Sequence, residues 1–178
     1  MRNSLGRGVV WCFLALLLLG AHPVPAQTVP ARASLLEDGA YGRELITRIG
    51  QAKRRIICAF YLFKVGERRG NLPAAVAREL VRARQRGVEV TVILEGEKPV
   101  GDDNRAAASL LARGGVRVLL ARGKKATHVK AIAIDDRYVL LGSHNLSHSA
   151  LSRNDELSVL LDAPELAAQV GRYLERIR

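Results

Sequence analysis

The chain has 178 residues, of which 48% are hydrophobic and 25% are charged. This balance excludes a wholly disordered chain, and the length suits one domain with a sizeable core. The formal net charge of +11 indicates a partner that carries negative charge, such as nucleic acid, an anionic membrane surface or polyphosphate, and charge alone does not choose among them.

The first 26 residues have the pattern of a secretory signal peptide. Arg2 and Arg7 form a positive start, residues 9–20 are an apolar run, and small residues precede the expected cleavage between Ala26 and Gln27. We therefore expect export to the periplasm or to the outside of the cell. Because this segment holds two arginines and no acidic residue, its removal lowers the net charge to +9. An uncleaved membrane anchor is the alternative, although the run is shorter than the ~20 residues that a span needs.

After the signal peptide we expect a flexible segment over residues 27–33 and one catalytic domain over residues 34–178, because no linker divides the remainder. In chain order, hydrophobic periodicity predicts a helix over 41–53, strand 55–63, helix 71–86, strand 88–94, helix 105–113, strands 116–121, 129–134, 138–141 and 156–161, and helix 164–177. The first part alternates strand and helix, which favours a parallel sheet with crossover helices, and a hairpin follows. The expected fold is α/β, with a mixed, largely parallel sheet flanked by helices.

Residues 128–145 contain the pattern H-x-K-x4-D-x6-G-S-x-N. Its fixed positions are His128, Lys130, Asp135, Gly142, Ser143 and Asn145. Six specified residues at an average usage of roughly 5% each arise by chance at about one start in 10⁷ to 10⁸, so the signal is specific. Side chains two apart in a strand point the same way, and a hairpin can therefore bring the imidazole and ammonium to the hydroxyl and amide. Such a set suits a phosphate diester.

This pattern resembles the HKD signature of the phospholipase D superfamily, in particular its single-motif Nuc-like and Zucchini-like endonuclease subgroup. The stretches 86–88 and 154–156 also resemble that family. The resemblance implies a homodimer in which two motifs meet. One His128 attacks phosphorus and forms a phosphohistidine, and the other protonates the leaving oxygen and then activates water.

The resemblance also assigns roles to the remaining site residues. It implies that Lys130 and Asn145 hold the phosphate, with Ser143 assisting. It implies that Glu156 orients the nucleophilic histidine, and that Asp135 supports the site structurally. No metal and no cofactor is required by this mechanism. His144 and His148 are expected outside the chemistry, because His144 points away from the neighbouring motif residues and His148 lies in a loop.

The expected substrate is nucleic acid, cut with little sequence preference, because the chain has no base-reading motif and no evident stacking platform. The candidate contacts to further phosphates are basic residues near the motif or after the first strand: Arg122, Lys124, Lys125, Arg153, Arg68 and Arg69. For each of them a solvated surface charge is the alternative. Two other functions stay open, a lipid phosphodiesterase of the phospholipase D type at a membrane surface and a catalytically silent binder. The intact motif argues against the silent binder.

Overall fold

The computed structural model describes residues 28–66, 71–97, 99–123 and 125–177. The predicted signal peptide, and Arg68, Arg69 and Lys124 among the predicted phosphate contacts, lie outside the described residues. The described elements follow in the order β1 (Arg32–Glu37), α1 (Gly39–Gln51), β2 (Arg55–Phe60), α2 (Leu72–Gln85), β3 (Glu89–Glu95), α3 (Gly101–Arg113), β4 (Arg117–Ala121), β5 (Lys130–Ile134), β6 (Tyr138–Gly142), β7 (Leu157–Asp162) and α4 (Pro164–Glu175). No helix that the structure describes has the length and apolar character of a membrane span.

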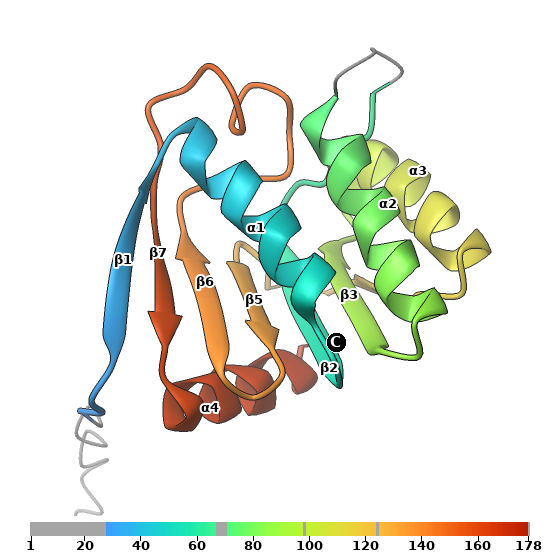
Figure 1. Ribbon diagram of the computed structural model, residues 1–178. Coiled ribbons are helices and arrows are strands. Elements are labelled where there is room, and N and C mark those ends of the chain that lie inside the picture. The colour runs from blue at the N-terminus through green and yellow to red at the C-terminus, as the bar shows by residue number, and fades with distance from the viewer. Residues whose placement is uncertain (1–27, 67–70, 98, 124, 178) are drawn as a thin grey trace, which may run out of the picture.

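Seven strands form one sheet in the order β1-β7-β6-β5-β2-β3-β4 (Figure 1). β2, β3 and β4 pair in parallel and are connected by α2 and α3. The other four described ladders are antiparallel. The sheet is mixed, as predicted. It is not largely parallel, however, because only the β2-β3 and β3-β4 ladders are parallel. From β5 onward each strand runs opposite to its neighbours in the sheet.

Helices cover both faces of this sheet, α1 to α3 on one face and α4 on the other (Figure 1). In β2, Ile56, Cys58 and Phe60 point into the larger core under α1, α2 and α3. Ile57 and Ala59 point to the opposite face and pack with Leu174 of α4. Because β2 is buried on both faces, its run of apolar residues shows no alternation with polar ones.

The β5–β6 hairpin forms as predicted, and its turn connects the sheet to the end of α1. Asp135 and Asp136 both have positive φ, as the two-residue turns of tight hairpins require. The carboxylate of Asp135 accepts hydrogen bonds from the backbone N–H groups of Lys53, Arg54 and Arg55 at 2.8, 2.8 and 3.0 Å. Burial alone would raise the pKa of Asp135, but these hydrogen bonds outweigh burial and hold the pKa below its ordinary value.

Several predicted boundaries are wrong; the strand predicted over 55–63, for example, ends at Phe60. The flexible segment does not extend to residue 33, because Arg32 and Ala33 already pair with Asp162 and Leu161 of β7. Five of the six side chains of β1 are exposed, so this edge strand carries no alternating pattern to reveal it. α3 begins at Gly101 rather than at Arg105. Its first turn contains two acidic residues, which interact favourably with the helix dipole at that end.

Candidate active site

The segment that carries His128 enters β5 from the loop after β4 and is held from both sides. The backbone N–H of Thr127 donates to the carboxylate of Glu95 at 2.6 Å. Glu95 is only 4% exposed and also accepts from the N–H of Glu97. On the other side, the N–H of Tyr61 donates to the carbonyl of Val129 at 3.0 Å. His128 itself is exposed and lies between these two anchors.

Asn104, in the first turns of α3, fixes the strand ends behind this segment. Its side chain is fully buried and makes three hydrogen bonds. The amide oxygen accepts from the N–H of Phe63 at 2.7 Å, and the amide nitrogen donates to the carbonyls of Tyr61 and Glu95 at 2.8 Å each. Asn104 therefore joins the carboxyl ends of β2 and β3, which supply both anchors of the His128 segment. Nothing in the sequence pattern marks Asn104 or Glu95 for this role.

Lys130 lies beside His128, as the motif predicts. Its Nζ is 3.4 Å from Nδ1 of His128 and donates to the His128 carbonyl at 3.1 Å. The ring of Tyr61 lies against both, 4.6 Å from the His128 ring and 5.5 Å from the Lys130 Nζ. Burial lowers the pKa of Lys130, and the nearby charge of Glu156 acts in the opposite direction. The pair thus brings an imidazole and an ammonium together at one end of the sheet.

Ser143 and Glu156 face each other at the same end of the sheet, where β6 ends and β7 begins. The hydroxyl of Ser143 donates to the carboxylate of Glu156, and Asn154 donates to its other oxygen at 3.1 Å. Ser143 also accepts from the N–H of Leu157 at 3.1 Å. The predicted contact of Glu156 with the nucleophilic histidine is not formed among the described residues of this one chain. Glu156 instead positions Ser143.

Asn145 follows the end of β6 and is half-buried. Its amide oxygen is buried and has no hydrogen-bond partner among the described residues. A buried polar atom without a partner is costly, so such atoms often mark a place where a ligand binds. The expectation that Ser143 and Asn145 share a face of a strand is wrong in detail, because β6 ends at Gly142 and both lie in the segment beyond it.

Asp135 does not belong to this site, although it is part of the motif. It follows the far end of β5, about 17 Å along the strand from Lys130. Its hydrogen bonds go to the backbone after α1, so in this chain Asp135 holds the turn of the hairpin.

His144 is buried below the site and has the packing role that the sequence predicts. Its ring stacks on Tyr41, with centroids 4.3 Å apart. Its Nε2 is 3.0 Å from the carbonyl of Asp38 and its Nδ1 is 2.7 Å from Oγ of Ser158. Burial lowers the pKa of His144, against smaller opposing effects of Asp38 and Glu156. His148 is half-buried in the loop before β7.

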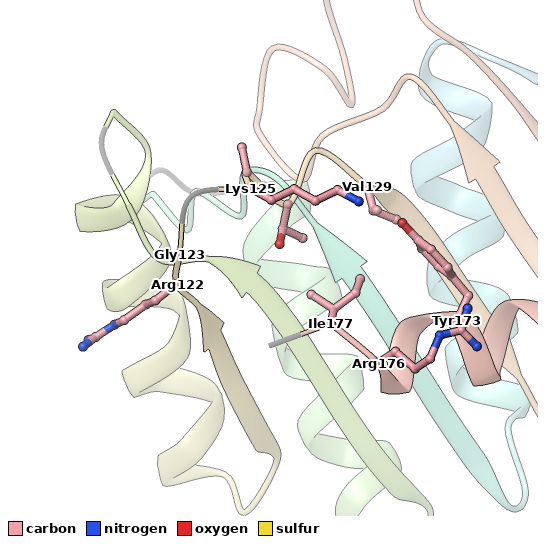
Figure 2. Close-up of a pocket in the computed structure, with 9 residues that line it drawn as sticks. Arg122, Gly123, Lys125, Val129, Tyr173, Arg176 and Ile177 are labelled. Carbon is pink, nitrogen blue, oxygen red and sulfur yellow. The ribbon is translucent and has the colours of Figure 1, made fainter. Parts of the chain in front are cut away.

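Among the described residues, the basic residues predicted to contact further phosphates lie in two different loops. Arg122 and Lys125 are exposed in the loop that leads to His128 and line a pocket beside it (Figure 2). Arg153 is exposed in the loop between β6 and β7. The same end of the sheet therefore carries the site and these three cations.

The site as a whole combines an exposed imidazole with an ammonium, a hydroxyl and an amide, held by a buried network. Hydrogen-bond donors and a cation next to a nucleophile are what transfer of a phosphoryl group requires. Among the described residues, no three His, Cys, Asp or Glu side chains gather as ligands of a metal ion would. The imidazole, ammonium, hydroxyl and amide together can bind a phosphate diester and attack its phosphorus.

Comparison with known proteins places the chain in a family. A family model described as "Cardiolipin synthase, PLD-like domain" matches residues 45–178, so the chain belongs to the family of phospholipase D-like domains. Cardiolipin synthase B of Escherichia coli K12 is 31% identical over 122 residues, which are 67% of this chain and 28% of the synthase. The chain thus spans less than a third of the length of this curated relative.

Solved structures share the fold. Nuc from Salmonella typhimurium, a phospholipase D family member, matches with a TM-score of 0.71 at 23% identity, over 82% of this chain and 93% of Nuc. NucT from Helicobacter pylori matches with a TM-score of 0.67 at 23% identity, over 83% of this chain and 96% of NucT. At these identities the likeness shows the fold, a single mixed sheet between two layers of helices.

Proposed function

We propose that this protein is a metal-independent phosphodiesterase that hydrolyses nucleic acid, with low sequence specificity, through a phosphohistidine at a homodimer interface. The observation that carries the proposal is the exposed imidazole of His128, with the Nζ of Lys130 3.4 Å from its Nδ1 and with its segment held on both sides by Glu95 and Tyr61. A nucleophile fixed in this way is preorganised for attack on a bound phosphate.

The chemistry has two steps. In the first, a ring nitrogen of His128 bonds to phosphorus while the bond to the leaving oxygen breaks, and a second imidazole gives that oxygen its proton. In the second, water attacks the phosphohistidine after giving a proton to the second imidazole, and His128 is released. Lys130 and Asn145 donate to the nonbridging oxygens, where negative charge develops. For Asn145 the donor is its side-chain NH2 group, and the buried amide oxygen, which has no partner among the described residues, can accept a hydrogen bond from the partner subunit or from a protonated group.

The second imidazole comes from a second copy of the chain. Among the described residues, His144 is buried and bonded to Asp38 and Ser158, and His148 is half-buried with its Nδ1 enclosed. Neither presents a free ring beside His128. A two-fold axis near the site would supply another His128, together with a second Lys130 and Asn145.

A partly exposed apolar row next to the site supports this dimer. Leu35 pairs with Val159 and Val159 pairs with Leu141, so the three side chains lie side by side on one face of the sheet. Leu157 lies on the same face and follows Glu156 directly. Leu35 and Leu157 are 59% and 54% exposed, although large apolar side chains normally avoid water. A second copy packed on this row would lie against the rim of the site.

Nucleic acid is favoured as the substrate by the charge around the site. Arg122, Lys125 and Arg153 are exposed on the loops at the same end of the sheet, and the whole chain carries a net charge of +11. Contacts of this kind bind backbone phosphates and carry no base preference. They also explain why we expect cleavage of many sequences.

A lipid phosphodiester is the second candidate substrate, because the curated relative with 31% identity is a cardiolipin synthase. The chemistry at phosphorus is the same for both. The anionic surface of a membrane would also be attracted to the cations beside the site.

Cleavage assays in excess EDTA separate these possibilities. Plasmid DNA, RNA and vesicles of phosphatidylglycerol with cardiolipin are offered to the protein and to its His128→Ala variant, with His148→Ala as the histidine control. We expect DNA or RNA cleavage that survives EDTA, disappears in His128→Ala and persists in His148→Ala. If only the lipids of the vesicles are hydrolysed, the substrate is a lipid and not nucleic acid. Loss of all cleavage in EDTA would contradict the mechanism.

We also propose that the protein is exported, with cleavage between Ala26 and Gln27, on the pattern of its first 26 residues. Mass spectrometry of the N-terminal peptide of the protein recovered from its host tests this. A start at Gln27 supports export, and a chain that still begins at residue 1 contradicts cleavage.

A further inference from the structure

A pocket of about 530 Å³ lies directly behind the segment that carries His128. It is formed between the loop after β4 and the last turn of α4, two parts of the chain that are separated by some fifty residues (Figure 2). Thr127 and Val129 form its wall on the side of the site, and Tyr173 and Arg176 form the opposite wall. Its size is within the range of pockets that take small organic molecules.

The lining of this pocket is cationic. Arg122, Lys125 and Arg176 contribute to it, and none of its lining residues is acidic. In Figure 2 the amino end of Lys125 extends toward Tyr173, whereas Arg122 points away from the hollow. None of the three cations forms an ion pair within the described part of the chain. Their charges therefore favour an anionic ligand.

The pocket also offers an aromatic surface. Tyr173 is 45% exposed, and its hydroxyl end points toward Lys125 in Figure 2. The guanidinium carbon of Arg176 lies 5.7 Å from the ring centroid. A cation next to an exposed ring is the combination with which proteins hold a nucleobase and its phosphate.

The pocket and the proposed active site are two sides of one short segment. Side chains alternate in an extended chain, so Thr127 and Val129 face the pocket while His128 between them faces the site. Only the backbone of this segment separates the two, so a polynucleotide that is held at His128 and passes over the segment places a neighbouring nucleotide on the side of the pocket.

We propose that this pocket is a nucleotide subsite that binds a residue of a single-stranded polynucleotide next to the one being cleaved, and this inference rests on the proposed function. The base of that residue packs on Tyr173, and its phosphate lies between Lys125 and Arg176. A flat ring is specifically suited to a base, which makes a nucleotide a better occupant than a lipid phosphate. Sequence preference stays low, because stacking does not distinguish bases strongly.

The test measures the affinity of the full chain for a labelled single-stranded 12-mer of thymidine in EDTA. All variants are made in the His128→Ala background, so that binding is measured without cleavage. We expect Tyr173→Ala and Lys125→Ala to weaken binding about tenfold. Tyr173→Phe, which keeps the ring, and Arg113→Ala, which removes an exposed cation at the end of α3, bind as the parent does.

Two results would overturn the subsite. The first is a Tyr173→Ala variant that binds the 12-mer as tightly as Arg113→Ala does. The second is a loss of binding that comes with a changed molecular mass in sedimentation, because Tyr173 would then be a contact between subunits. Hydrolysis of bis(p-nitrophenyl) phosphate by the unmodified protein in EDTA tests the chemistry separately, since this small diester carries no second nucleotide for the pocket. Failure of that reaction would count against the proposed function and not against the binding site.

Discussion

Asn104 makes no contact with a substrate phosphate in the proposed mechanism, yet the position of His128 depends on it. Its side chain joins Phe63, Tyr61 and Glu95, which are 9 to 43 positions away in the sequence. The motif predicts His128, Lys130, Ser143 and Asn145 because their types and spacing are informative by themselves. Partners such as Asn104 and Glu95 are set by the three-dimensional packing of β2, β3 and α3, which no local pattern encodes.

Replacing Asn104 by Ala should lower the free energy of unfolding by about 3 kcal/mol or more, because two carbonyls and one N–H are left buried without partners. Urea unfolding measures this. Ser109→Ala on the exposed side of the same helix serves as the control, since its hydroxyl bonds only to the helix backbone. A loss below about 1 kcal/mol for Asn104→Ala would show that these groups find other partners.

His144 should make the protein less stable in mild acid. Because burial lowers its folded-state pKa below the unfolded value of about 6.5, the unfolded chain takes up the proton first. Stability is then complete above about pH 6.5 and is lost as the pH falls toward and through the folded pKa. Melting temperatures between pH 7.5 and 5 measure this loss, which should be smaller in His144→Asn and unchanged in His148→Asn. An equal pH dependence in His144→Asn and the unmodified protein would contradict the assignment.

The elements that the sequence predicts well are those with an apolar face. The helices α1, α2 and α4 and the strands of the hairpin all bury such a face, and their predicted ranges agree with the structure within a few residues. The edge strand β1 could not be predicted, because five of its six side chains face solvent and its pairing with β7 is made by the backbone. The start of α3 was missed because polar residues fill its first turn.

At the turn of the hairpin, Asp135→Ala should cost about 2–4 kcal/mol at neutral pH, because three backbone N–H groups lose a charged acceptor. Asp136→Ala is a matched control, since Asp136 has the same positive φ and only a long ion pair with Arg54 at 3.5 Å. The pKa of Asp135 is depressed in the folded state, so its contribution is present above the unfolded pKa and is lost as the pH falls through the folded pKa. Urea unfolding at pH 7 and in acid should therefore show a difference from Asp136→Ala that shrinks in acid.

For the whole molecule, the fold supplies one motif and one exposed imidazole per described chain, and the proposed reaction uses two. The apolar row of Leu35, Val159, Leu141 and Leu157 is next to the site, and within the described chain Leu35 and Leu157 are exposed while Val159 and Leu141 are half-buried. Sequence alone indicates a dimer only through the count of motifs. The sequence could not indicate which surface forms the dimer interface. These leucines are exposed because α4 does not cover that part of the sheet.

A charge in this apolar row should separate the subunits. Leu35→Arg is expected to sediment as a monomer and to lose phosphodiesterase activity, since burying an unpaired guanidinium in the interface costs several kcal/mol. Thr47→Arg, on the exposed side of α1, should keep both the mass and the activity of the unmodified protein. Full activity in a monomeric Leu35→Arg variant would refute the shared site.

A phosphohistidine on His128 is the intermediate that distinguishes the proposed mechanism from any other, and it can be trapped. The protein is mixed with a short single-stranded oligonucleotide in excess EDTA, quenched within the first turnover under conditions that preserve phosphohistidine, and its mass and modified peptide are determined. We expect an added nucleotide fragment on His128, absent from the His128→Ala variant. Cleavage that proceeds with no adduct at His128, or that stops in EDTA, would contradict the proposed mechanism.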